Sequence, residues 1–225
     1  MESIQVSLQG KNSQALPKGI SAKAAIEQLN GAVPPEVFAV KANGVEIDLL
    51  ASLETDSTLQ PLMFDSPEGK EIYRHSSTHI MAQAVKECFP TAQLTIGPAI
   101  EGGFFYDFAF ERPFTPEDLE KIEARALDII KRNLSVSRRE FSKEEAIEFF
   151  KSRGEPYKVE LIQGFPDGEP VSAYTQGDFV DLCRGPHLPA TGYVKAFKLL
   201  NSAGAYWRGD ERNPMLQRLY GTSFP

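Results

Sequence analysis

The sequence predicts an α+β protein built from two domains. Three observations lead to this prediction: short segments with alternating apolar residues fill the first 65 positions, capped helix patterns follow, and a turn-rich junction at 65–69 lies between them. A chain of 225 residues has room for two domains, and a 41% apolar composition is sufficient for a core. We therefore expect domains at 1–65 and 66–225.

The first domain has the element order of a β-grasp. Residues 4–8 alternate apolar and polar, as in a strand with one buried face, and Ser21 is suited to cap a short helix. Residues 37–40 predict a strand, and Asn43-Gly44 favours a hairpin turn after it. Residues 59–64 are expected as a last strand at the sheet edge, because their proline cannot donate a ladder hydrogen bond.

The second domain is predicted to begin with a helix over residues 66–89. Ser66 is its expected cap, and Pro67 suits its first position. His75 and His79 are four residues apart, so they project from the same face of this helix. A histidine pair on a helix is more often packed or solvated than functional, so its meaning depends on what the fold brings beside it.

Residues 95–107 are predicted to form a strand, a glycine-rich turn and a second strand. The glycines, including Gly97, allow close approach of a ligand or of another backbone. Their spacing is not that of the glycine-rich nucleotide loops, so bound ATP or NAD is not implied. Tyr106 is equally suited to the core and to a site.

Capping patterns at Thr115 and Ser142 predict two further helices that we interpret as scaffold. Residues 157–162 alternate as a strand does, which would make Lys158 a solvated strand lysine. Residues 183–187 follow as a loop, because Gly185 and Pro186 are incompatible with a helix.

The chain has three histidines and two cysteines, and four of these five residues lie in two short segments. His75, His79, Cys183 and His187 form an N3S set that zinc accepts. A closed zinc shell would be structural, and an open one would activate water. A metal-free site using histidine with lysine or aspartate, or a Cys183 nucleophile, is equally compatible with the spacing.

Composition argues against several classes of protein. The net charge of −7 argues against non-specific coating of nucleic acid, and no apolar run is long enough for a membrane span. Two cysteines and an N-terminus without an export pattern indicate a cytoplasmic protein. Residues 183–225 differ in charge from the rest of the chain, because they contain six basic residues and only two acidic ones. They form either an ordinary solvated surface or a phosphate-facing patch.

The motifs, taken in order, resemble the N-terminal half of bacterial-type threonyl-tRNA synthetases. They are HSSTH at 75–79, GPAIEGGFFYDF at 97–108, GEPYKVE at 154–160, CRGPH at 183–187 and AGAYWRGDERNPMLQRLYGT at 203–222. The resemblance covers essentially the whole chain. It implies a TGS (β-grasp) domain at 1–65 and, at 66–225, an α+β editing domain with a mainly antiparallel sheet, of the kind shared with alanyl-tRNA synthetases. The motifs of the class II aminoacylation core are not found, so a fragment or a separately encoded editing unit is expected.

The implied activity is hydrolysis of serine wrongly esterified to tRNA(Thr). Threonine differs from serine by one methyl group, which provides only about 1–3 kcal/mol of discrimination, or roughly 10–200-fold. A second site that admits serine and excludes the extra methyl group completes the selection.

The resemblance also implies roles for individual residues. The implied catalytic residues are His75, His79, Lys158, Cys183 and His187. Lys158 and His75 are the expected activators of the attacking water. Substrate contacts are implied for Gly97, Tyr106 and Asp181.

Cofactors and partners follow from the same resemblance. The alanyl branch is associated with zinc and the threonyl branch with water alone, so we favour a metal-free site, with zinc at the four Cys/His residues as the alternative. The expected partners are the acceptor end of tRNA(Thr) carrying serine and the class II core of a synthetase, with no membrane. The competing interpretation is a zinc-stabilised RNA-binding or regulatory module without hydrolytic activity.

Overall fold

The computed structural model describes residues 2–225 and has the predicted α+β character. The chain divides into two compact units. One unit contains the described residues up to Tyr73 together with Gly185–Pro189, and the other contains Arg74–Arg184 and Ala190–Pro225. No helix within residues 2–225 is both long enough and apolar enough to cross a membrane.

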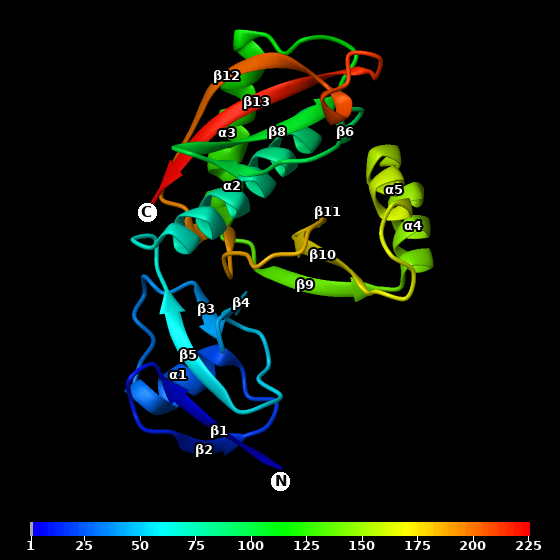
Figure 1. The fold of residues 1–225 in the computed structure, drawn as a ribbon. Coiled ribbons are helices and arrows are strands. Elements are labelled where there is room, and N and C mark those ends of the chain that lie inside the picture. The colour runs from blue at the N-terminus through cyan, green and yellow to red at the C-terminus, as the bar shows by residue number, and fades with distance from the viewer. Residues whose placement is uncertain (1) are drawn as a thin grey trace. The chain divides into compact units, whose positions relative to one another are not determined.

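The first unit is a mixed five-stranded sheet with one helix (Figure 1). Its elements are β1 (Ser3–Leu8), β2 (Gln14–Pro17), α1 (Ala22–Asn30), β3 (Ala39–Ala42), β4 (Val45–Asp48) and β5 (Ser57–Leu62). The strand order is β2-β1-β5-β3-β4, with β1 and β5 parallel and the other pairs antiparallel. Ile26 of α1 packs in the same apolar cluster as Val6 and Leu59 of these two central strands.

The prediction that the last strand of this unit lies at the sheet edge was wrong. β5 lies in the interior of the sheet, between β1 and β3. The pairing with β1 covers Ser57 to Leu59 only, whereas the pairing with β3 extends over Pro61. Pro61 is tolerated because it lies beyond the stretch that pairs with β1, so its missing N–H leaves no gap there.

The second unit contains two antiparallel sheets, in agreement with the expected mainly antiparallel arrangement. The larger sheet has the order β12-β13-β8-β6, with β7 paired to β8. Its strands are β6 (Gln93–Leu94), β7 (Ala99–Ile100), β8 (Gly103–Ala109), β12 (Ala196–Tyr206) and β13 (Met215–Phe224). Helices α2 (Pro67–Cys88) and α3 (Pro116–Arg132) lie along this sheet in Figure 1. Ser77 of α2 and Ser223 of β13 are joined by a 2.8 Å hydrogen bond.

The smaller sheet has the order β11-β10-β9 and packs against two short helices. Its elements are β9 (Val136–Phe141), α4 (Lys143–Ser152), α5 (Pro156–Gln163), β10 (Val171–Gln176) and β11 (Phe179–Leu182). Phe150 of α4 and Ile162 of α5 meet Phe141 and Ala173 of the sheet in one apolar cluster. This cluster joins α5 to the sheet that contains β11.

The local helix signals were read correctly. Ser66 Oγ accepts a hydrogen bond from the Gly69 N–H at 3.0 Å at the start of α2, and full capping boxes begin α3 at Thr115 and α4 at Ser142. The prediction of a strand at 157–162 was wrong, because Pro156 occupies a first helical position and the segment is α5. Lys158 is buried, with 3% of its surface exposed, and is not a solvated strand lysine.

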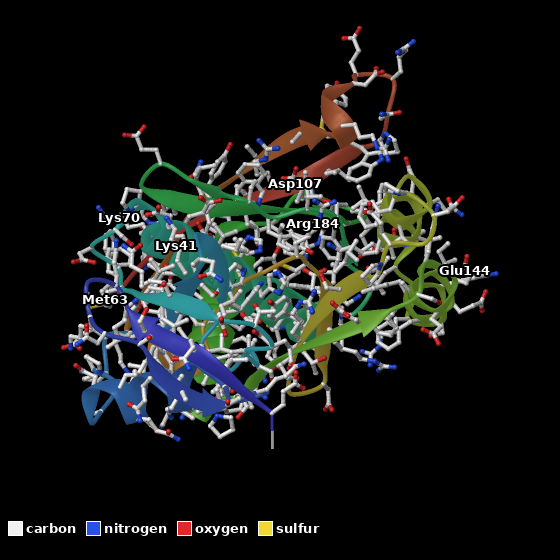
Figure 2. All side chains as sticks on the ribbon, turned by 60° about the horizontal axis from the view of Figure 1, so that its bottom comes forward. Lys41, Met63, Lys70, Asp107, Glu144 and Arg184 are labelled. Atoms are coloured by element: carbon white, nitrogen blue, oxygen red, sulfur yellow. The ribbon has the colours of Figure 1, made fainter. Side chains whose placement is uncertain are left out.

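The basic residues of the C-terminal segment are largely neutralised by acidic neighbours. Bidentate hydrogen bonds of 2.7 and 2.9 Å join Arg218 to Asp107, which lies on β8 and is labelled in Figure 2. Lys198 pairs with Glu123 at 2.7 Å, and Arg212 pairs with Asp210 at 2.7 Å. This pairing favours the ordinary solvated surface over the phosphate-facing patch.

Candidate functional site

Helix α2 and the end of β11 bring a thiol and two imidazoles together in the second unit. The His75 and His79 rings lie one turn apart, with centroids separated by 5.4 Å. Cys183 follows β11 directly, and its Sγ lies 2.9 Å from His75 Nε2. The Cys183 backbone is tied to Ser172 of β10 through a carbonyl that accepts the hydroxyl at 2.6 Å and an N–H that donates to the Ser172 carbonyl at 3.2 Å.

Asp181 is the centre of a buried polar network beside this cluster. Its Oδ1 lies 2.7 Å from Lys158 Nζ, and its Oδ2 accepts the Tyr106 hydroxyl proton at 2.7 Å. His79 Nε2 lies 3.7 Å from the same Oδ2. Each of these four side chains comes from a different element: β11, α5, β8 and α2.

Because this network is buried, the charged groups of Asp181 and Lys158 have to be paired. Asp181 and Lys158 are 1% and 3% exposed, and a buried charge is stable only when it is paired and hydrogen-bonded. The Lys158 ammonium also lies 5.5 Å from the centroid of the Tyr106 ring, within the range of a cation–π contact. An ammonium and a carboxylate are therefore held in a fixed geometry where water has little access.

Gly97 is required beside Tyr106. A Cβ at position 97 would lie 2.1 Å from Tyr106 Cδ2, far inside van der Waals contact. The Gly97 backbone also hydrogen-bonds to His75, which favours the protonated form of that imidazole. The glycine therefore lets the chain after β6 pass between a buried ring and a candidate catalytic histidine.

The pKa values of the candidate groups are shifted toward neutral forms. Burial lowers the pKa of His75, the Lys158 charge adds to this effect, and Asp181 with the Gly97 backbone opposes it. Burial, His75 and Lys158 together hold the pKa of His79 well below its ordinary value. Burial and the neighbouring Asp181 raise the pKa of Tyr106 well above its usual range. At neutral pH the site therefore offers neutral imidazoles and a phenol that donates.

Three of the predicted ligands fit a metal ion. The ligand atoms of His75, His79 and Cys183 lie within 4.8 Å of one another. In a tetrahedral zinc site with bonds of about 2.0–2.3 Å, ligand atoms are separated by somewhat less than 4 Å, so small movements would close a shell. The Lys158 ammonium would repel a dication at this position, whereas the Asp181 carboxylate, which raises the pKa of His75 more strongly than Lys158 lowers it, would attract one.

His187 belongs to the other unit. It is buried within Gly185–Pro189, and its backbone N–H donates to Asp48 Oδ1 at 2.8 Å. Its role as a catalytic residue or a zinc ligand stays a prediction. The other seven predicted residues lie in the second unit, where direct contacts link His75, His79, Gly97, Tyr106, Lys158, Asp181 and Cys183.

Glu155, which immediately precedes α5, was missed by the sequence interpretation. It is 4% exposed, its Oε2 accepts the Leu94 N–H at 2.8 Å, and its Oε1 pairs with Lys86 Nζ at 2.9 Å. Burial raises its pKa despite these partners. A glutamate before a helix that begins with proline is ordinarily solvated. The local sequence therefore gives no indication that Glu155 is buried and paired.

Part of the second unit matches a known family. Residues 171–220 match a family described as "Threonyl and Alanyl tRNA synthetase second additional domain". This segment contains β10, β11, Asp181 and Cys183, together with β12 and the start of β13.

The whole chain is similar to part of several bacterial threonine–tRNA ligases. It is 52% identical to the ligase of Symbiobacterium thermophilum over 221 residues, which cover 98% of this chain and 34% of that protein. The ligase of Acidithiobacillus ferrooxidans is 57% identical over 186 residues, covering 83% of this chain and 29% of the relative. The ligase of Nitrosomonas europaea is 49% identical over 219 residues, covering 97% and 34%. The chain thus spans about a third of the length of these curated relatives.

Proposed function

We propose that this chain is an editing unit that hydrolyses the ester bond of seryl-tRNA(Thr) with an activated water. The observation that carries the proposal is the position of the neutral, half-buried His75 in the same site as the buried Lys158–Asp181–Tyr106 network. The similarity to threonine–tRNA ligases supports tRNA(Thr) as the partner, and the matched domain supports an editing role. A class II synthetase core is the proposed partner of the chain.

The domain assignment belongs to this proposal. Residues 1–65 are proposed as the TGS domain, which agrees with a mixed sheet whose two central strands are parallel. Residues 66–225 are proposed as the editing domain, with its two antiparallel sheets. Within this assignment, the end of β11 and the middle of α2 form the hydrolytic site.

The proposed reaction is attack of a water oxygen on the carbonyl carbon of the seryl ester. A new carbon–oxygen bond forms to water, and the bond between that carbon and the ribose oxygen breaks. His75 is suited to take the water proton, because its lowered pKa leaves the imidazole neutral at pH 7. The departing ribose oxygen takes that proton from the His75 imidazolium, which restores the neutral imidazole, so serine and free tRNA are the products.

Lys158 has a complementary task in this scheme. Asp181 holds its ammonium at 2.7 Å in a water-poor environment, where a fixed charge stabilises the developing negative charge more strongly than it would in water. Tyr106 and Asp181 are proposed to hold the seryl hydroxyl or amine, and Gly97 to let the terminal adenosine approach.

Zinc is the alternative that the Cys/His cluster keeps open. If a metal is bound, His75, His79 and Cys183, with His187 as the proposed fourth ligand, would hold it, and it would polarise the ester or activate water. In that case the cluster, and not the Lys158 network, would be the essential feature. We favour the metal-free site because 98% of the chain is similar to threonine–tRNA ligases, and the resemblance associates the threonyl branch with water alone.

The test is release of serine from seryl-tRNA(Thr) by this chain, with and without a chelator. Lys158→Met should abolish release, whereas Lys151→Met, the same change at an exposed lysine of α4, should not. Activity that resists the chelator supports the metal-free site, and loss with the chelator supports zinc. Tight tRNA binding without any hydrolysis would favour the RNA-binding module and would remove the catalytic roles.

A further inference from the structure

Lys158 lies on a helix that is too short to hold its own position. Helix α5 has eight residues, and helices of this length are not stable in isolation. Its preceding residue, Glu155, makes no side-chain capping hydrogen bond. The position of the Lys158 ammonium relative to Asp181 therefore depends on what packs around α5.

The turn between β12 and β13 contacts α5 directly. This turn begins with the short helix η2 (Trp207–Gly209) at the end of the hairpin, as Figure 1 shows. The Trp207 ring meets the Tyr157 ring edge-on, with centroids 5.1 Å apart. Trp207 Nε1 donates to Glu160 Oε1 at 3.3 Å, and Arg208 Nη2 lies 3.3 Å from the same oxygen.

The contacting residues of α5, Tyr157 and Glu160, lie on either side of Lys158 in the sequence. Tyr157 and Glu160 are three residues apart and so share one face of α5, next to the face from which Lys158 projects. Trp207 is 4% exposed, which makes its contact with Tyr157 a packed interaction. The Arg208–Glu160 pair is about half exposed on both sides and contributes little on its own.

The turn is shaped to make these contacts. Arg208 has φ 55° and ψ 23°, the left-handed conformation that residues other than glycine rarely adopt. Asn213 Nδ2 donates to the Trp207 carbonyl at 2.9 Å, and the Trp207 N–H donates to the Pro214 carbonyl at 3.0 Å. Trp207 is thus held within the protein, whereas Tyr206 and Arg208 stay partly exposed.

We propose that the Trp207–Arg208 turn is a positioning element for Lys158, holding α5 through Tyr157 and Glu160 so that the ammonium stays in register with Asp181. Glu155, which immediately precedes α5, contacts Leu94 and Lys86 and so also helps to hold the start of the helix. The inference rests on the proposed function for its effect on rate, but its effect on the accessibility of Lys158 is independent of any activity.

The first readout is chemical. Brief acetylation of the folded 225-residue chain, followed by peptide mass spectrometry, measures how fast each lysine reacts. Buried Lys158 should react slowly and exposed Lys151 rapidly. Trp207→Ala should accelerate acetylation of Lys158 several-fold and leave Lys151 unchanged. Tyr206→Ala, at the 41% exposed neighbouring position, is the control and should change neither lysine.

The second readout is the rate of serine release. Trp207→Ala should lower kcat by about 10–100-fold with little change in KM, because a shift of about 1 Å in a catalytic group has an effect of this size. Trp207→Phe keeps the ring contact with Tyr157 and should recover most of the rate. If Trp207→Ala does not fold, Tyr157→Ala tests the same contact from the other side.

The outcomes separate this inference from the proposed function. Unchanged Lys158 acetylation in folded Trp207→Ala and Tyr157→Ala overturns the positioning role, whatever the activity. Accelerated acetylation in a chain whose wild type releases no serine supports the positioning role while the proposed function fails. Trp207 is the single tryptophan, so its fluorescence should also change in Tyr157→Ala if the two rings meet in solution.

Discussion

Replacing Gly97 by alanine tests the geometry of the site most sharply. The added Cβ would lie 2.1, 2.8 and 2.9 Å from Cδ2, Cγ and Cε2 of Tyr106, whereas carbon atoms in contact are normally about 3.5–4.0 Å apart. The ring therefore has to move by more than about 1 Å. It is almost fully buried and stacked on Phe108 with centroids 4.8 Å apart, so little space is available for this movement.

The size of the effect follows from these constraints. Overpacking of a well-filled core typically costs about 1–3 kcal/mol, and we expect Gly97→Ala to lower the free energy of unfolding by that amount. Displacement of the ring also displaces the hydroxyl that donates to Asp181 at 2.7 Å. A displacement of this size in a catalytic site lowers rates by about 100-fold.

The assay combines urea unfolding with single-turnover serine release. Gly102→Ala is a matched control, because Gly102 has φ 76° and its added Cβ would meet no atom within 4 Å. That variant should lose a similar stability, about 1–2 kcal/mol, through backbone strain, yet keep its rate. In a Tyr106→Leu background, Gly97→Ala should cost at least about 1 kcal/mol less than in the wild type. Full activity and full stability of Gly97→Ala would refute the reasoning.

Three further predictions concern the charges of the second unit. Asp181→Asn leaves the buried Lys158 ammonium without its carboxylate and should destabilise the fold by about 3–5 kcal/mol in urea unfolding; a loss below about 1 kcal/mol would contradict the buried pair. The pKa values of His75 and His79 are lowered in the folded state, so the unfolded chain binds more protons below about pH 6.5. Stability should therefore be level near pH 7 and fall as the pH drops below about 6.5. Serine release should fall only at a lower pH, because it depends on the lowered folded-state pKa of His75. Release that rises on acidification would exclude a neutral imidazole base. Arg218→Met removes two charge-assisted hydrogen bonds to buried Asp107 and should cost about 2 kcal/mol without affecting release, and an unchanged melting temperature would show that the bidentate pair is not formed in solution.

Local signals in the sequence account for the elements that were predicted correctly. The capping residues of α2, α3 and α4 act within one helical turn, so Ser66, Thr115 and Ser142 identify the helix starts without knowledge of the fold. The same locality places His75 and His79 on one face of α2. The contact of His75 with Cys183, 108 residues away, was suggested by the concentration of Cys and His in two short segments and was also implied by the family resemblance.

The two wrong predictions, at 157–162 and at β5, concern elements whose structure depends on distant residues. The alternation at 157–162 indicates a strand, but Pro156 begins a short helix, which packs against Trp207 and against the apolar cluster of the smaller sheet. An interior position for β5 could not be read from Pro61, because the outcome depends on how far β1 extends beside it. In both cases residues that are distant in the sequence determine the local structure, and the local sequence pattern does not reveal them.

The charge of the C-terminal segment also depends on residues that are distant in the sequence. Its basic residues stand out in the sequence because their acidic partners are far away in the chain: Asp107 lies 111 residues from Arg218, and Glu123 lies 75 residues from Lys198. Counting charges along the chain therefore overestimates the positive charge at this surface.

The central claim is that the site removes serine and spares threonine. The most direct test is the ratio of the single-turnover rate constants for release of serine and threonine from tRNA(Thr), with Lys158→Met as the blank. We expect serine to be released at least about 10-fold faster, and the Lys158→Met rates to equal spontaneous hydrolysis. Equal release of the two amino acids, or undiminished release of serine by folded Lys158→Met, would contradict this account.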